Sequence, residues 1–250
     1  MGGLIIVVPC YNEFSRIQKD RFIQFLIEDN NCQIIFSDDG STDNTIQVLN
    51  EIRDSATHKV FINRLDVNAG KAQAVRDGVL FCLKNNLEFD RIAYLDADLA
   101  TSLEECLLIS NVIKGSVVFA FGSRISKIDN NIRRKKYRHL IGRVVATIIS
   151  TMLGISVYDT QCGCKVFDRN LALNVFKDKF ISKWLFDVEI FYRIIVLSGR
   201  ESMKDISREI PLISWIDTND SRVSFSYFFK MWFDLYSIYR QYNEKSNKHL

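Results

Sequence analysis

Two aspartates, Asp96 and Asp98, stand one residue apart directly after a short apolar segment, residues 92–95. Carboxylate oxygens are the ligands that Mg²⁺ and Mn²⁺ prefer in proteins. A cation held here would act as a Lewis acid on a diphosphate whose bond is breaking. In extended backbone the two side chains would point to opposite faces, so we expect a turn that begins at Asp96. Taken alone, such a pair is more often two solvated turn residues.

Acidic residues also follow other apolar segments of the chain. Glu13 comes after residues 4–8, and Asp38 and Asp39 come after residues 33–37. Ligands of parallel sheets bind at the carboxyl ends of the strands, and all these carboxylates are placed there. This shared position predicts one acidic site at a sheet edge, because charges scattered over a solvated surface would not keep it.

The elements that must position these residues alternate along the chain, which predicts an α/β fold with a mainly parallel sheet flanked by helices. Residues 159–167 read as a polar loop, residues 132–139 as a basic segment and residues 243–250 as a polar tail. The expected strands are 4–8, 33–37, 60–63, 92–95, 117–121 and 206–213, and the expected helices are 16–29, 42–53, 70–83, 140–153, 184–197 and 224–242.

Composition narrows the class of protein. The chain has 250 residues, of which 47% are hydrophobic and 25% charged, so it can bury a core without disulfides. A net charge of +3 argues against a general nucleic-acid binder. The six cysteines and three histidines lack the spacing of a zinc site. No apolar run approaches the roughly 20 residues that span a bilayer, so we expect a cytoplasmic protein with at most peripheral membrane contact.

Five short motifs follow one another in a fixed order, each after a strand or at a helix start. They are Pro9-Cys-Tyr-Asn-Glu13, Asp38-Asp-Gly-Ser-Thr-Asp43, Asn68-Ala-Gly-Lys71, Asp96-Ala-Asp98 and Gly122-Ser-Arg124. This set resembles the family 2 glycosyltransferases, which have the GT-A fold. The resemblance implies a metal-dependent enzyme that takes its sugar from a nucleoside-diphosphate donor. It implies a nucleotide-sugar-binding half at 1–124 and an acceptor half at 125–242, within one domain spanning 1–242.

The same resemblance assigns roles on the donor side. It implies that Asp96 and Asp98 bind Mg²⁺ or Mn²⁺ and that Lys71 and Arg124 face the phosphates. Asp98 and Arg124 are then catalytic, and Asp96 also contributes to donor binding. The residues implied to hold the nucleoside are Pro9, Tyr11, Glu13, Asp38 and Asp39.

Further motifs narrow the resemblance to the polyprenyl-phosphate branch, closest to the dolichyl-phosphate β-glucosyltransferases. They are Asp159-Thr-Gln-Cys-Gly163, Lys165-Val-Phe167 and Trp184-Leu-Phe-Asp-Val-Glu189. Mannose synthases of this branch carry Gln where this chain has Ala100, which favours glucose over mannose and leaves a third metal ligand unassigned. The implied reaction is inverting transfer of a hexose to a polyprenyl-type or dolichyl-type lipid phosphate.

The acceptor decides whether a general base is needed. A lipid phosphate is already anionic near neutral pH, so basic and polar residues such as Arg133, Arg134 and Gln161 would suffice to position it. A saccharide hydroxyl would require a carboxylate base, for which Asp187 is the first candidate and Glu189 the second. The ordinary interpretation of Arg133 and Arg134 is a solvated basic surface. The ordinary interpretation of Asp187 and Glu189 is a favourable charge at the start of a helix or a salt bridge.

Three interpretations therefore stay open. The first is transfer to a lipid phosphate, the second is transfer to a saccharide hydroxyl in surface polysaccharide assembly, and the third is a degenerate, non-catalytic nucleotide-sugar binder. The sequence is compatible with UDP or GDP, and with a monomer or a homodimer. An aromatic segment, residues 225–239, fits core packing or a dimer interface slightly better than membrane contact.

Overall fold

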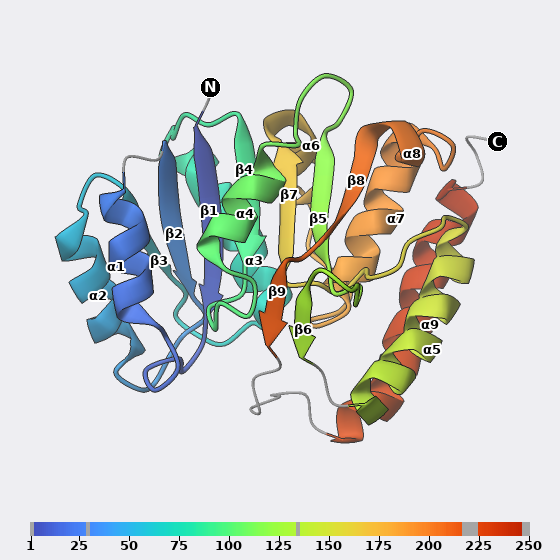
Figure 1. The fold of residues 1–250 in the computed structure, drawn as a ribbon, viewed down its shortest axis with the longest axis horizontal. Coiled ribbons are helices and arrows are strands. Elements are labelled where there is room, and N and C mark those ends of the chain that lie inside the picture. The colour runs from blue at the N-terminus through green and yellow to red at the C-terminus, as the bar shows by residue number, and fades with distance from the viewer. Residues whose placement is uncertain (1–2, 29–30, 134–135, 217–224, 247–250) are drawn as a thin grey trace.

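The computed structural model describes residues 3–28, 31–133, 136–216 and 225–246. A seven-stranded sheet runs through the middle of the molecule, and helices cover both of its faces (Figure 1). The strands are β1 Leu4–Cys10, β2 Cys32–Asp38, β3 Val60–Arg64, β4 Arg91–Leu95, β5 Phe119–Ser123, β6 Asn131–Arg133, β7 Cys164–Asp168, β8 Ser207–Pro211 and β9 Ser214–Ile216. The helices are α1 Lys19–Ile27, α2 Thr45–Ser55, α3 Lys71–Lys84, α4 Leu103–Ser110, α5 Lys136–Leu153, α6 Arg169–Val175, α7 Phe186–Ser198, α8 Met203–Ile206 and α9 Phe225–Ser246.

The strand order is β3-β2-β1-β4-β7-β5-β8, and β7 is antiparallel to both of its neighbours. The other neighbouring pairs of this sheet are parallel. A second, two-stranded sheet pairs β6 with β9. The predicted mixed α/β architecture with a mainly parallel sheet is therefore confirmed.

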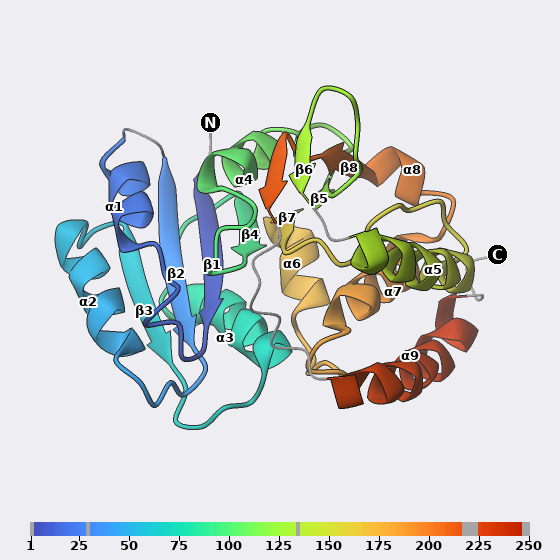
Figure 2. The ribbon, with the colours of Figure 1, turned by 60° about the horizontal axis from the view of Figure 1, so that its bottom comes forward.

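The core has two layers because side chains alternate along each strand. On β1, Ile5 and Val7 belong to a buried cluster that also includes residues of α3, α5, α6, α7 and α9, whereas Leu4, Ile6 and Val8 belong to a second cluster with residues of α1, α2 and α4. Figure 2 shows α5, α7 and α9 gathered at the end of the molecule away from β3. Burial on both faces explains why the β1 sequence is one continuous apolar run.

Three expectations need correction. The segment 159–167, read as a polar loop, contains β7 at its end. The helix expected from residue 140 begins at Lys136, inside the basic segment, and α9 continues to Ser246, into the expected polar tail. Ser246 is buried there because Arg200 donates to its backbone oxygen at 3.1 Å and to its side-chain oxygen at 2.7 Å.

Candidate active site

The carboxyl edge of the sheet collects the ends of β1, β2, β4 and β5. Because β7 runs in the opposite direction, its first residue lies at this same edge, and Cys164 pairs with Leu95. The loop before β7, residues 158–163, is therefore brought against the turn that follows β4. Asp96 N donates to Gly163 O at 3.0 Å, which joins the two segments.

The turn predicted after β4 is present. Leu99 N donates to Asp96 O at 3.2 Å, and Leu99 has a φ of 52°, a left-handed conformation that a leucine rarely adopts. Each aspartate has a cationic partner: Lys71 Nζ lies 2.5 Å from Asp96 Oδ1, and Arg16 Nη2 lies 3.2 Å from Asp98 Oδ2. Asp98 Oδ1 accepts from Ala100 N at 3.0 Å. The two carboxylates thus stand at one turn, each beside a basic side chain.

The two aspartates are suited to a divalent cation by their chemistry. Asp96 Oδ1 is buried and lies 2.5 Å from Lys71 Nζ, but it accepts no other hydrogen bond from the described residues. A buried carboxylate oxygen in this condition retains lone pairs for a cation. The described part of the chain holds no group of three acidic, histidine or cysteine side chains arranged to bind a metal. Any further ligands would then be diphosphate oxygens or water.

Lys71 opens α3 and faces this turn. Its side chain also lies 5.9 Å from the centre of the Phe186 ring. Burial alone would lower the pKa of Lys71, but the negative charges of Asp96 and Asp187 outweigh that effect and raise it. Lys71 therefore stays protonated and is available as a cation for phosphate oxygens.

The loop that leads to Lys71 is held by Asp39. Its two carboxylate oxygens accept from Ala69 N at 2.7 Å and from Gly70 N at 2.8 Å. Burial raises the pKa of Asp39. Gly70 is required in this loop because its φ is 99° and an added Cβ would lie 2.9 Å from the Lys183 side chain. The contacts of Asp39 shape the loop, so its predicted role as a direct donor contact stays a prediction.

The other residues predicted to bind the donor lie at or just after the ends of β1 and β2. Asp38 is fully buried; its Oδ1 accepts from Ser41 N at 3.2 Å and its Oδ2 lies 3.3 Å from Arg64 Nε. Glu13 N donates to Thr45 Oγ1 at 2.7 Å, and Glu13 Oε2 lies 3.7 Å from Arg16 Nε. Pro9 and Tyr11 are half-buried at the same strand end.

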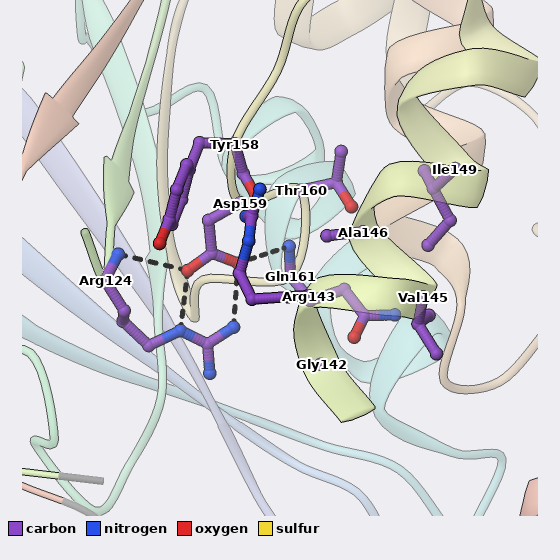
Figure 3. A pocket seen from close by; sticks show the side chains of 10 residues that line it. All are labelled: Arg124, Gly142, Arg143, Val145, Ala146, Ile149, Tyr158, Asp159, Thr160 and Gln161. Carbon is purple, nitrogen blue, oxygen red and sulfur yellow. Dashed lines mark hydrogen bonds and ion pairs between the residues drawn. The ribbon is translucent and has the colours of Figure 1, made fainter. Parts of the chain in front are cut away.

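Arg124 follows β5 and forms a fork with Asp159 (Figure 3). Arg124 Nε and Nη2 donate to the two Asp159 oxygens at 2.6 and 2.8 Å, and Arg124 N donates at 3.1 Å. Burial would raise the pKa of Asp159, but the Arg124 guanidinium holds it well below its usual range. The Arg124 guanidinium also lies 5.3 Å from the centre of the Trp215 ring. Arg124 is thereby fixed in direction beside the loop that contacts Asp96.

Glu209 on β8 supports this fork from behind. Its Oε1 accepts from Ser123 Oγ at 2.7 Å and from Asp159 N at 2.8 Å, and its Oε2 accepts from Tyr158 N at 2.9 Å. Glu209 accepts three hydrogen bonds through its two oxygens, which requires a carboxylate. A glutamine here would direct its NH₂ group toward one of the three donors.

A small pocket of about 30 Å³, room for about two water molecules, lies between this loop and α5 (Figure 3). Arg143 stacks on Tyr158 there, with its guanidinium 3.6 Å from the ring centre, and donates to Tyr158 O at 2.9 Å. Gln161, predicted to contact the acceptor, also lines this pocket. Of the other two predicted acceptor residues, Arg134 and the side chain of Arg133 lie outside the described residues.

Asp187 is held in a buried polar cluster at the start of α7. Its Oδ1 accepts from Lys165 Nζ at 2.6 Å and also from the Tyr94 hydroxyl. Lys165 is completely buried and donates as well to Cys162 O at 2.8 Å. Asp187 is only 5% exposed. This carboxylate is already neutralised by an ammonium group, which is a poor arrangement for accepting a proton from a substrate.

Sequence reasoning assigned no role to Arg16, Arg143, Lys165 or Glu209. Arg16 had a usable signal, since it stands three residues after Glu13 and can reach the same carboxylate. Lys165 had another, because a single lysine inside an apolar strand needs a buried anion. Arg143 and Glu209 lie on separate elements, α5 and β8, so only the fold brings them to the 158–161 loop.

The chain belongs to glycosyl transferase family 2, whose family model matches residues 5–176. Its relatives include the dolichyl-phosphate beta-glucosyltransferase of Saccharomyces cerevisiae, 31% identical over 242 residues, covering 88% of this chain and 69% of that protein. The enzyme of the same name from Dictyostelium discoideum is 30% identical over 209 residues, covering 76% of this chain. The match spans 61% of that relative's length.

Solved structures with the same fold include glucosyl-3-phosphoglycerate synthase from Mycobacterium tuberculosis. Its complex with UDP superposes with a TM-score of 0.67 at 15% identity, covering 95% of this chain and 80% of that one. Its complex with Mn²⁺, UDP and glucosyl-3-phosphoglycerate gives a TM-score of 0.63 at 16% identity, covering 98% and 78%. The predicted glycosyltransferase family and GT-A fold are therefore confirmed.

Gly163 lies where no side chain fits, which gives a direct test of the turn after β4. A Cβ added at Gly163 would lie 2.1 Å from Asp96 Oδ2, so Gly163→Ala must displace the Asp96 carboxylate. We expect glycosyl transfer to fall by roughly a hundredfold, the effect of misplacing a reacting group by about 1 Å. Steady-state rates and thermal unfolding check this. Gly3→Ala is the control, because its Cβ would meet atoms only at 3.6 Å and beyond.

Proposed function

We propose that this chain transfers glucose from UDP-glucose to a polyprenyl-type or dolichyl-type lipid phosphate, with inversion at the anomeric carbon. A phosphate oxygen of the acceptor forms the new bond to the anomeric carbon as the bond to the donor diphosphate breaks, and UDP leaves. The relatives' printed name, dolichyl-phosphate beta-glucosyltransferase, supports both substrates. The UDP in the structural neighbour supports the nucleotide.

The choice of acceptor rests on one observation: the candidate carboxylates in residues 125–242 are already paired with other side chains. Asp159 is held by Arg124, and Asp187 by Lys165 and Tyr94. Glu189 is fully buried, and its oxygens accept from Arg193, Tyr242 and Ile181 N. A hydroxyl acceptor needs a carboxylate that is free to take its proton. A phosphate acceptor needs none, which fits these paired side chains.

A divalent cation, Mg²⁺ or Mn²⁺, completes the proposal. Asp96 and Asp98 would hold it, and it would supply Lewis acidity to the departing diphosphate. Lys71 would pair with donor phosphate oxygens and Arg124 with the phosphate groups between donor and acceptor. Glu13, Asp38, Tyr11 and Pro9 would surround the nucleoside, at the strand ends beside the turn. The reaction would take place at the cytoplasmic face of a membrane that carries the lipid phosphate.

The acceptor class is tested with UDP-[¹⁴C]glucose and two matched lipids, a polyprenyl phosphate and the corresponding polyprenol. We expect acid-labile label in the organic phase with the phosphate and none with the alcohol, because only the alcohol must lose a proton. GDP-mannose in place of UDP-glucose serves as the donor control. Label found only in water-soluble saccharide, or equal transfer to both lipids, would contradict the proposal.

A further inference from the structure

The outward face of α9 carries large aromatic side chains. Trp232, Phe233 and Tyr236 are 37%, 71% and 59% exposed. The opposite face is packed, with Leu235 and Ile238 buried in the core and the Tyr242 ring stacked on Tyr192 at 5.9 Å. Helix α9 is therefore already docked through its other side, and the exposed parts of these three aromatic side chains add nothing to the core. The expectation that this segment serves core packing holds only for the inward residues.

A loop beside α9 extends this surface. Ser182 Oγ donates to Asp234 Oδ2 at 2.7 Å, which ties the loop before α7 to the middle of α9. On either side of Ser182, Ile181 and Trp184 are 45% and 37% exposed. We call the five residues Ile181, Trp184, Trp232, Phe233 and Tyr236 the aromatic patch.

On α9, the exposed charged side chains between residues 230 and 240 are basic. Lys230 and Arg240 are exposed on α9, each within a few residues of Phe233 and Tyr236. The acidic residue between them, Asp234, is 9% exposed and turned inward to Ser182. An apolar stripe flanked by basic residues is the composition of a helix that lies in the surface of an anionic membrane. Trp and Tyr favour that depth because they combine apolar rings with a polar group.

A second copy of the chain is a poorer occupant. A two-fold contact centred between Phe233 and Tyr236 would place Lys230 opposite Arg240 if the helices were antiparallel, and each opposite itself if they were parallel. Both arrangements set like charges against each other. Lipid phosphates would instead neutralise these side chains.

The patch leads directly to the donor side of the active site. Ser182 Oγ also accepts from Leu185 N at 3.0 Å, at the start of α7. The next residue, Phe186, is the ring that contacts Lys71. In addition, Lys183 O accepts from Ala72 N at 3.2 Å, which joins this loop to the first turn of α3. A surface resting on α9 would therefore lie beside the residues that receive the diphosphate.

We infer that the aromatic patch, with Lys230 and Arg240, is the surface through which this protein binds an anionic phospholipid membrane. The biological purpose of this contact rests on the proposed lipid acceptor, because it would set the active site at the depth of the lipid phosphate groups. In the described part of the chain no helix is both long and apolar enough to span a bilayer. Lipid contact through α9 is accordingly a contact at the membrane surface.

The test is sedimentation with vesicles of phosphatidylcholine alone and with 30% phosphatidylserine. We expect Phe233→Ser with Tyr236→Ser to weaken partitioning at least roughly tenfold for each ring removed. Lys230→Gln with Arg240→Gln should weaken it roughly fivefold for each charge, and only on anionic vesicles. The matched control is Ile128→Ser, which removes a fully exposed apolar side chain between β5 and β6 and should change nothing.

Unchanged vesicle binding in the patch variants would overturn the inference. So would a concentration-dependent dimer, seen by analytical ultracentrifugation, that disappears in the same variants. Glucose transfer to polyprenyl phosphate in detergent tests the proposed function separately from membrane binding. The patch variants should retain this activity, because detergent removes the need for a membrane surface. If the wild-type chain bound vesicles but transferred no glucose to polyprenyl phosphate, the proposed acceptor would be rejected. The inference that the aromatic patch binds membranes would be unaffected.

Discussion

Asp98→Asn is expected to lower glycosyl transfer by at least about a hundredfold while the protein stays folded. Asparagine keeps an oxygen for the Ala100 N–H bond, 3.0 Å long in the wild type, so the turn should survive. It removes the negative charge, and with it one of the two carboxylates proposed to hold the cation. Loss of one preorganised electrostatic contact to a departing group costs about 10²–10³ in rate. Steady-state kinetics with UDP-glucose and Mn²⁺ measure the effect.

A control must separate the role of Asp98 as a metal ligand from its ion pair with Arg16. The Arg16→Gln variant breaks the same 3.2 Å contact and leaves the carboxylate in place. If Asp98 holds the cation, Asp98→Asn should weaken Mn²⁺ binding in the presence of UDP, measured by electron paramagnetic resonance, and Arg16→Gln should not. Equal losses in both variants would mean that the ion pair itself is what matters. Near-normal turnover of Asp98→Asn would reject the metal assignment.

Lys165→Met is expected to lower the free energy of unfolding by about 3–5 kcal/mol, the usual effect of removing one partner of a buried ion pair. Lys165 is completely buried, and its ammonium contacts the Asp187 carboxylate at 2.6 Å. Methionine fills a similar volume but removes the ammonium group that contacts the Asp187 carboxylate. Because a domain is stable by only about 5–15 kcal/mol in total, this loss should be visible as a large shift of the urea midpoint.

The double variant Lys165→Met with Asp187→Leu tests the cause. Removing both charges should recover most of the lost stability, since two apolar side chains can replace a buried pair at little cost. Lys114→Met, at an exposed lysine, controls for the substitution itself. Equal losses in the single and double variants would show that Lys165 stabilises the fold through packing or its bond to Cys162 O, and not through Asp187.

The double variant also reports on the acceptor. If Asp187 has only a structural role, a double variant with restored stability should keep measurable transfer to a lipid phosphate. If Asp187 is a general base, the same variant should be inactive even when it is folded. The stability and activity readouts therefore address two different roles of one side chain.

Periodicity alone placed the acidic residues of the N-terminal half at one edge of a parallel sheet. Strands β1 and β2, buried on both faces, must be continuous apolar runs, and the polar residues that end them must lie at one edge of a parallel sheet. Glu13, Asp38 and Asp96 could therefore be placed together before any coordinates. The residues and order of the short motifs then gave the resemblance to the family 2 glycosyltransferases.

The arrangement of the C-terminal half depended on the tertiary structure. Strand β7 is short and interrupted by Lys165, so its sequence resembles a loop; it is a strand because β4 and β5 pair with it on both sides. Its reversed direction is what carries Gly163 and Asp159 to the edge of the sheet that holds Asp96. Local patterns report which face of an element is buried, but the partner of a polar side chain depends on which distant segments share that edge. Asp187 could accordingly be read as a base from its sequence, whereas the fold surrounds it with Lys165 and Tyr94.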